Sequence, residues 1–110
     1  MREEALSDLK VISVAGRIDG VTAQEFHEAI NQEFLDPVQH VVMDFKELTY
    51  INSAGLRTVL LVAKELRKAG KKFKLCSLPE PVMQVVKTSG IDKVIDVCDD
   101  RSIAIAEISS

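Results

Sequence analysis

Short apolar runs alternate with helical patterns along this chain, and that alternation limits its fold more than any other feature. The runs occupy residues 10–15, 41–45, 73–77 and 94–98. Their apolar residues do not alternate cleanly with polar ones, which is typical of strands covered on both faces. Residues 3–7 add a short edge strand. Strands that alternate with helices predict an α/β fold with short parallel connections.

Two longer segments between these runs have the spacing of amphipathic helices. Thr22 and Glu25 form the pattern of a capping box, and the helix that they open is expected to end at Asp36-Pro37. The other helix follows Ser53 and ends before Gly70, which suits the C′ position. The loop between the second strand and this helix, residues 46–53, lies at a carboxyl end of the sheet, where functional loops gather.

The last part of the chain holds two shorter helical segments. Pro79 and Pro81 begin a helix that Ser89-Gly90 closes. Residues 102–106 alternate like a strand, but Asp99 and Asp100 before them are typical of a helix start, so a helix is expected. The chain therefore predicts four to five strands and about four helices.

The 110 residues match the length of one domain, residues 1–110, because a domain commonly holds about 100–200 residues. The N-terminal segment has no apolar core of a signal peptide, and the longest apolar run, residues 59–63, is far shorter than the ~20 residues that span a bilayer. Cys76 and Cys98 fit neither a disulfide framework nor a CxxC site. We therefore expect two buried thiols in a cytoplasmic protein without a membrane segment.

A basic cluster contrasts with the net charge of −3. Its members are Lys64, Arg67, Lys68, Lys71, Lys72 and Lys74. Such a cluster is compatible with nucleic-acid binding, but it falls at the C-terminal end of a predicted helix, where cations interact favourably with the dipole. No aromatic residues are interleaved with it in the manner of a stacking surface, so no direct nucleic-acid contact is expected.

The catalytic motifs that the sequence partly matches are incomplete. His27 begins an HExxH-like pattern, but Asn31 occupies the place of the second metal-binding histidine, so His27 is expected to be a solvated helix residue. The segment Asn52-Ser53-Ala54-Gly55 lacks the first glycine of a GxSxG elbow. No glycine-rich phosphate loop occurs either. The sequence therefore predicts no enzyme, no metal site and no cofactor.

Ser53, at the head of the long helix, has two readings. Its hydroxyl can cap the helix by accepting a hydrogen bond from an N–H two or three residues on, a contact worth about 0.5–2 kcal/mol. It can also be a target of phosphorylation, which adds about −1.5 to −2 charges. A helix N-terminus tolerates that charge because free N–H groups and the dipole meet it. Ala54 and Gly55 would leave the hydroxyl uncrowded.

At these residues the sequence resembles the STAS family of anti-sigma factor antagonists. The family signature, Asp-Ser-(Ser/Thr/Ala)-Gly-Leu after an acidic-apolar strand end, is similar to residues 44–56, with Asn52 where many members have Asp. Asn retains a hydrogen-bonding side chain but lacks the charge. A second family element, Gly-Arg-(Leu/Ile)-Asp, matches residues 16–19, and a Lys/Gly-rich helix end with a strand and a Pro-started helix matches residues 69–86.

The resemblance spans residues 8–98 and implies a single domain with a mixed sheet. It also implies a bacterial regulator of transcription that binds an anti-sigma factor when unphosphorylated. That partner is a serine-protein kinase that phosphorylates Ser53 and so switches binding off, and a PP2C-type phosphatase reverses the change. The implied docking surface consists of Asp19, Tyr50, Asn52, Ala54, Gly55, Leu56 and Arg57.

Two other readings stay open at this point. The chain could be a STAS scaffold or accessory subunit, in a signalling assembly or a lipid transporter, without a phosphorylation cycle. It could also be an enzyme, although no constellation of acid, base and nucleophile supports this.

Overall fold

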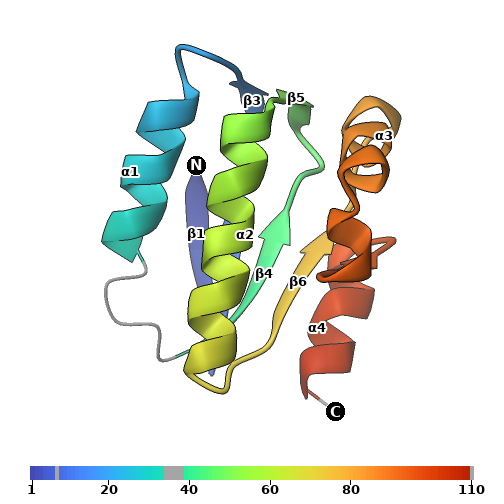
Figure 1. The fold of residues 1–110 in the computed structure, drawn as a ribbon. Helices are drawn as coiled ribbons and strands as arrows, with labels where there is room; N and C mark the ends of the chain where they lie inside the picture. Colours follow the sequence, from blue (N-terminus) through green and yellow to red (C-terminus); the bar gives the residue numbers. More distant parts are fainter. Residues whose placement is uncertain (7, 34–38, 110) are drawn as a thin grey trace.

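A five-stranded mixed sheet forms the centre of the computed structural model, which describes residues 1–6, 8–33 and 39–109. The strand order is β1-β2-β4-β6-β7, and only β1 runs antiparallel to its neighbour (Figure 1). The strands are β1 (Arg2–Leu6), β2 (Leu9–Ser13), β4 (His40–Asp44), β6 (Phe73–Cys76) and β7 (Asp96–Cys98). The α/β class, the edge strand and the mixed sheet are thus confirmed.

The beginning of the last strand was predicted too early. A 3-10 turn, η1 (Ile91–Lys93), comes first, and the N–H of Ile95 still donates to the carbonyl of Ile91 at 2.9 Å. Val94 is therefore 53% exposed. Pairing with β6 starts only at Asp96.

A second, two-stranded parallel sheet was not predicted. It pairs β3 (Gly16–Ile18) with β5 (Leu48–Ile51), so the expectation that residues 46–53 form a loop is wrong. The register shifts between Gly16 and Arg17, and Leu48 and Ile51 are buried while the two residues between them are exposed. In strands of three and four residues with this burial pattern, buried and exposed side chains do not alternate. The alternation that predicts a strand from sequence is therefore missing.

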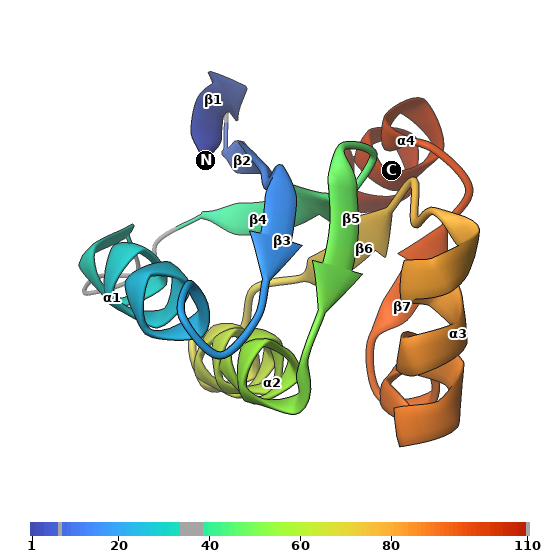
Figure 2. The same ribbon diagram turned by 90° about the horizontal axis from the view of Figure 1, so that it is seen from above.

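The four helices lie on both faces of the main sheet. They are α1 (Ala23–Glu33), α2 (Ser53–Lys68), α3 (Glu80–Ser89) and α4 (Arg101–Ser109). Figure 2 shows α1 and α2 on one face and α4 on the other. The tail is thus a helix, as expected, and Asp100 Oδ1 accepts a hydrogen bond from the N–H of Ile103 at 2.9 Å. The predicted end of the first helix at Asp36-Pro37 lies outside the described residues.

Each face of the sheet has its own apolar cluster. The larger one joins the sheet to α1, α2 and α3 around fully buried side chains such as Met43, Phe45 and Leu75. The smaller one lies under α4 and contains Cys76 and Cys98, which are both free and buried, as predicted. Burial raises the pKa of both thiols, and that of Cys76 to about 11.

Two ionic contacts attach α4 to the sheet. The guanidinium of Arg101 lies 2.9–3.0 Å from the buried Asp44 carboxylate and donates to Ser13 Oγ at 2.9 Å. At the other end of the helix, Lys74 Nζ lies 3.2 Å from Glu107 and 2.8 Å from Asp96. Lys74 is only 7% exposed, so it does not belong to the basic surface, contrary to the sequence prediction.

Candidate functional site at the start of helix α2

The start of α2 is capped by Asn52 and not by Ser53. Asn52 has extended backbone angles, and its Oδ1 accepts a hydrogen bond from the N–H of Gly55 at 2.9 Å. Its own N–H donates to the carbonyl of Ile18 at 2.8 Å, which fixes the chain just before the helix. Ser53 is therefore the first helical residue, and the capping reading of Ser53 is wrong.

Ser53 and Ala54 are exposed on the first turn of the helix. This turn carries no acidic side chain, so no carboxylate on it already neutralises the positive end of the dipole. The Ser53 hydroxyl is thus reachable from solvent and close to backbone amides that favour a negative group. This geometry can accept a phosphoryl group without unfolding the helix.

Gly55 and Leu56, which the resemblance placed on the docking surface, are buried instead. A Cβ at Gly55 would lie 2.6 Å from Ile18 Cγ2 and 2.8 Å from Ile51 Cγ1. Leu56 is 6% exposed and belongs to the larger core. The glycine therefore allows α2 to approach β3 and β5 closely. The buried side chain of Leu56 is not available to a partner.

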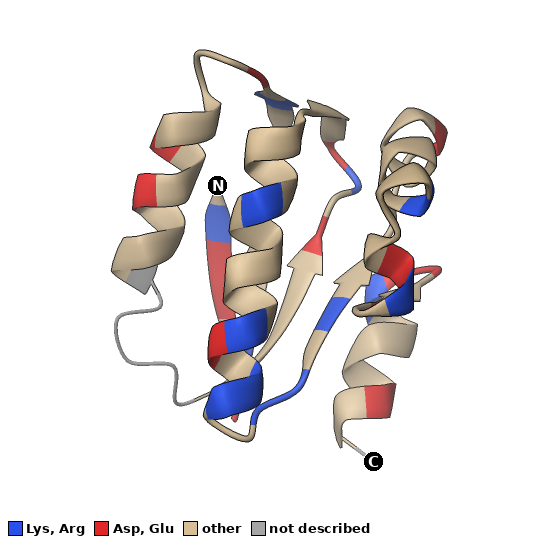
Figure 3. Cartoon of the chain, viewed as in Figure 1, with Lys and Arg blue, Asp and Glu red and all other residues tan. Residues whose placement is uncertain are grey.

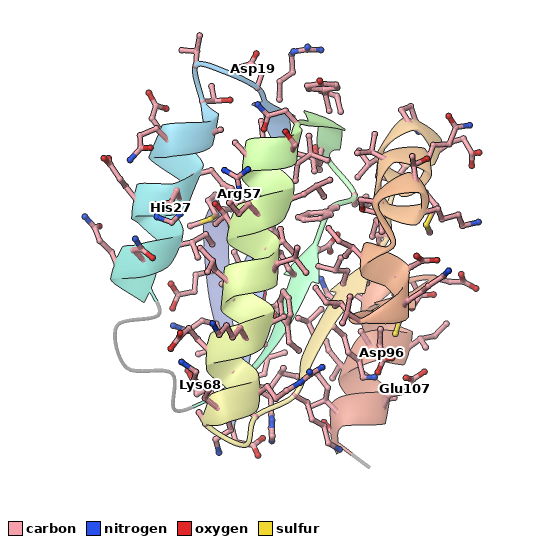
Figure 4. The ribbon with its side chains drawn as sticks, in the orientation of Figure 1. Asp19, His27, Arg57, Lys68, Asp96 and Glu107 are labelled. Atoms are coloured by element: carbon pink, nitrogen blue, oxygen red, sulfur yellow. The ribbon has the colours of Figure 1, made fainter. Side chains whose placement is uncertain are left out.

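Asp19 leaves β3 at the same end as Asn52 leaves β5, because the two strands are parallel. Its Oδ1 accepts hydrogen bonds from the N–H groups of Thr22 and Val21, and these contacts lower the pKa of the carboxyl. Asp19 is therefore ionised at neutral pH. Its side chain lies near the turn that precedes α1 (Figure 4). The Thr22 hydroxyl donates to the carbonyl of Arg17 at 2.6 Å and accepts from the N–H of Asp19, so it is not engaged in the predicted capping box with Glu25.

Tyr50 and Arg17 form one exposed unit on neighbouring strands. The guanidinium carbon of Arg17 lies 4.7 Å from the centre of the Tyr50 ring, a cation–π contact. Arg17 Nε also lies 3.7 Å from Asp19 Oδ2. The predicted docking residues Tyr50 and Asp19 are thus connected through Arg17, which the sequence prediction did not include.

A shallow hollow of about 330 Å³ separates the first turns of α1 and α2. Arg57 and Ala54 line it on one side, and His27 lines it on the other. His27 Nδ1 lies 3.1 Å from Thr58 Oγ1, and Asn31 Nδ2 lies 3.1 Å from His27 Nε2. His27 is therefore half-buried and not a freely solvated residue as predicted.

The structure thus brings five of the predicted residues together at one surface: Asp19, Tyr50, Asn52, Ala54 and Arg57, beside Ser53. It adds Arg17 and Val21, which is 80% exposed in the turn between β3 and α1. An apolar residue between a glycine and a predicted helix start is the sequence signal that could have identified Val21.

No cluster of three or more metal-ligating side chains occurs among residues 1–6, 8–33 and 39–109. Within the same ranges, every helix is too short or too polar to cross a membrane.

Comparison with known proteins places these features in a family. The STAS domain model matches residues 2–104. BtrV of Bordetella bronchiseptica, provisionally named an anti-sigma factor antagonist, is 31% identical over 103 residues, which cover 94% of this chain and 89% of BtrV. The anti-sigma F factor antagonist of Paenibacillus polymyxa is 24% identical over 102 residues, which cover 89% of this chain and 85% of that protein.

Solved structures show the same fold. The anti-sigma factor antagonist SpoIIAA in its unphosphorylated form has a TM-score of 0.81 at 21% identity, with 98% of this chain and 95% of SpoIIAA covered. The phosphorylated form of SpoIIAA from Bacillus has a TM-score of 0.71 at 20% identity, with 97% of each chain covered.

Proposed function

This chain belongs to the STAS domain family, and from that premise we propose that it is an anti-sigma factor antagonist whose binding is switched by phosphorylation of Ser53. In this proposal the unphosphorylated protein binds an anti-sigma factor that is also a serine-protein kinase, in the bacterial cytoplasm. A PP2C-type phosphatase restores the binding form. The relatives named for this activity support the proposal, since BtrV aligns over nearly the whole chain.

The observation that carries the proposal is the position of Ser53. Its hydroxyl is exposed at the first residue of α2, and Asn52 alone caps the helix. Capping therefore does not explain the serine, because replacing its hydroxyl removes no contact of the cap. The neighbouring surface offers an ionised carboxylate on Asp19, a cation on Arg17 and the apolar Val21 for contact with a partner.

The switch acts through local charge. A phosphoryl group on Ser53 adds about −1.5 to −2 charges next to exposed Ala54 and Arg57, while the first-turn amides hold it in place. A partner that docks against the neutral hydroxyl must then desolvate a dianion, which weakens binding without a rearrangement of the domain. Asn52 keeps the cap without adding a second negative charge.

The direct test is phosphorylation by a cognate kinase. The chain is incubated with ATP and with candidate serine kinases from the same genome, and the modified residue is located by mass spectrometry. Ser102 is a matched control, because it is also an exposed serine in the first turn of a helix, α4, but lies outside the proposed docking surface. Phosphate on Ser53 alone supports the proposal.

Phosphate on both serines to equal extent would show that the kinase recognises any helix start. No phosphorylation with any candidate kinase would remove the switch and leave the scaffold or accessory-subunit reading, for which the chain would bind its partners without a phosphorylation cycle.

A further inference from the structure

A basic surface lies at the opposite end of α2 from Ser53. It consists of Lys64, Arg67, Lys68, Lys71 and Lys72, and we call it the basic end of α2. In Figure 3, Lys and Arg, drawn in blue, gather on the last turns of α2 and on the loop that follows. Among the described residues, the only carboxylate paired with this surface is that of Glu65, 3.8 Å from Lys68 Nζ.

The helix dipole explains only part of this charge. Its effect falls off within the last turn, where Arg67 and Lys68 lie. Lys71 and Lys72 follow Gly70, which ends the helix with a φ of 72°, and Lys64 lies before the last turn. In the part of the chain that the structure describes, Arg67, Lys71 and Lys72 form no ion pair. The protein thus concentrates uncompensated cations here although its net charge is −3.

A hollow of about 670 Å³ adjoins the basic end. Arg67, Lys71 and Lys72 stand on one side, and apolar side chains, among them Phe73 and Val94, also line it. Val94 is 53% exposed because the turn before β7 holds it outside the core. Asp96 and Glu107 stand at the far side, where Lys74 binds both (Figure 4). The hollow thus combines apolar side chains with unpaired cations on one side and carboxylates bound to Lys74 on the other.

We propose that the basic end of α2 and its hollow bind an acidic protein segment that inserts one apolar side chain. Charge complementarity selects glutamate and aspartate for the cationic side of the hollow, and the exposed Val94 offers a contact for the apolar side chain. A nucleic acid fits less well, because its evenly spaced phosphates would also meet Asp96 and Glu107, whereas a peptide can place its acidic side chains at the cations alone. Phe73, the aromatic residue in the lining, is partly buried and leaves little ring surface for stacking. A bilayer surface is broad and cannot enter a hollow.

This surface works independently of Ser53. Ser53 and Lys68 are the ends of a helix of 16 residues, which at ~1.5 Å per residue places them about 22 Å apart. The screening length at physiological ionic strength is about 8 Å, so a phosphate on Ser53 is not felt at the basic end. The acidic segment therefore binds equally to the phosphorylated and the unphosphorylated protein.

The test is a titration of the full-length, isotope-labelled chain with a short synthetic peptide that carries glutamates on both sides of one leucine, followed by NMR. We expect amide shifts at Arg67, Lys72 and Val94, and affinity at least about tenfold weaker in the Arg67→Glu/Lys72→Glu variant. The matched control Lys46→Glu/Lys87→Glu changes the net charge equally at exposed lysines elsewhere and is expected to bind like the wild type. Ser53→Asp is expected to bind normally as well.

Four results overturn the proposal. The first two are the absence of amide shifts at millimolar peptide and an equal loss of peptide affinity in both double variants. The other two are tighter binding of a peptide with lysines in place of the glutamates, and stronger binding at these residues of a DNA duplex or of vesicles with equal parts phosphatidylserine and phosphatidylcholine. Failure of Ser53 phosphorylation leaves this titration unaffected, so the two proposals fail separately.

Discussion

Replacing Asn52 by alanine tests the capping geometry on which the exposed serine depends. The change removes the acceptor that lies 2.9 Å from the Gly55 N–H, and Gly55 is buried, so water replaces that acceptor poorly. Loss of such a cap costs about 0.5–2 kcal/mol, and burial places the expected cost at about 1–2 kcal/mol. For a domain of this size, 1 kcal/mol corresponds to a fall of about 4 °C or more in Tm.

Two companion variants make the reasoning specific. Ser53→Ala removes an exposed hydroxyl and introduces a better helix former, so the free energy of unfolding should change by less than about 0.5 kcal/mol. Asn52→Asp keeps the acceptor and adds a charge favourable to the dipole, worth about 0.3–1 kcal/mol. Urea denaturation followed by circular dichroism measures all three. The reasoning fails if Ser53→Ala lowers the free energy of unfolding by about 1–2 kcal/mol while Asn52→Ala leaves it unchanged, because Ser53 would then be the cap.

Three further predictions concern the packing and the buried groups. Gly55→Ala should lower the free energy of unfolding by about 1–2 kcal/mol, because the overlap of the new Cβ with Ile18 and Ile51 outweighs the gain in helix propensity. An unchanged midpoint of urea denaturation would contradict the close approach of α2 to β3 and β5. Arg101→Ala should cost about 2–3 kcal/mol in the same assay, because Asp44 Oδ2 loses its cationic partner and only Oδ1 keeps a hydrogen bond, from the N–H of Lys46. A neutral result would show that the contact does not stabilise α4. Cys76 and Cys98 should react with a thiol reagent at pH 8 only in urea. Because the folded pKa of Cys76 is raised to about 11, its contribution to stability is present below pH 9 and is lost as the pH rises toward 11, and the raised pKa of Cys98 acts in the same direction. Stability that stays constant between pH 9 and 11 would contradict the raised pKa of Cys76.

Much of the fold could be predicted because helical spacing is a strong signal over ten or more residues, and the short apolar runs between the helices indicate buried strands. The long helix α2 and its end at Gly70 followed from the sequence, and Gly70 has the positive φ that its position requires. The short strands β3 and β5 could not be predicted. Their pairing joins segments about 30 residues apart, and the shift at Gly16 removes the remaining alternation.

The error at the cap has a similar origin. Asn52 and Ser53 are both good capping residues, and local preference does not choose between neighbours. A tertiary contact makes Asn52 the cap. The Asn52 N–H donates a hydrogen bond to the Ile18 carbonyl, so the extended chain continues to Asn52 and the helix begins at Ser53.

The site itself was predictable only in part. Ser53, Asn52 and Arg57 lie within one local segment, which a motif can reveal. Arg17, Val21 and His27 come from β3, the following turn and α1, and they join the surface because parallel pairing brings Asp19 beside Asn52. Such neighbours depend on strand pairing, which periodicity does not specify.

The most direct measurement of the central claim is a titration of the cognate anti-sigma factor kinase with wild-type protein, Ser53→Asp and Ser53→Ala, accompanied by the Tm of each variant. The account predicts that Ser53→Asp binds at least about tenfold more weakly, that Ser53→Ala binds like the unphosphorylated protein even after incubation with ATP, and that all three unfold at nearly the same temperature. Equal affinity of the two variants, or weaker binding of Ser53→Asp only together with a collapse of its Tm, would contradict it.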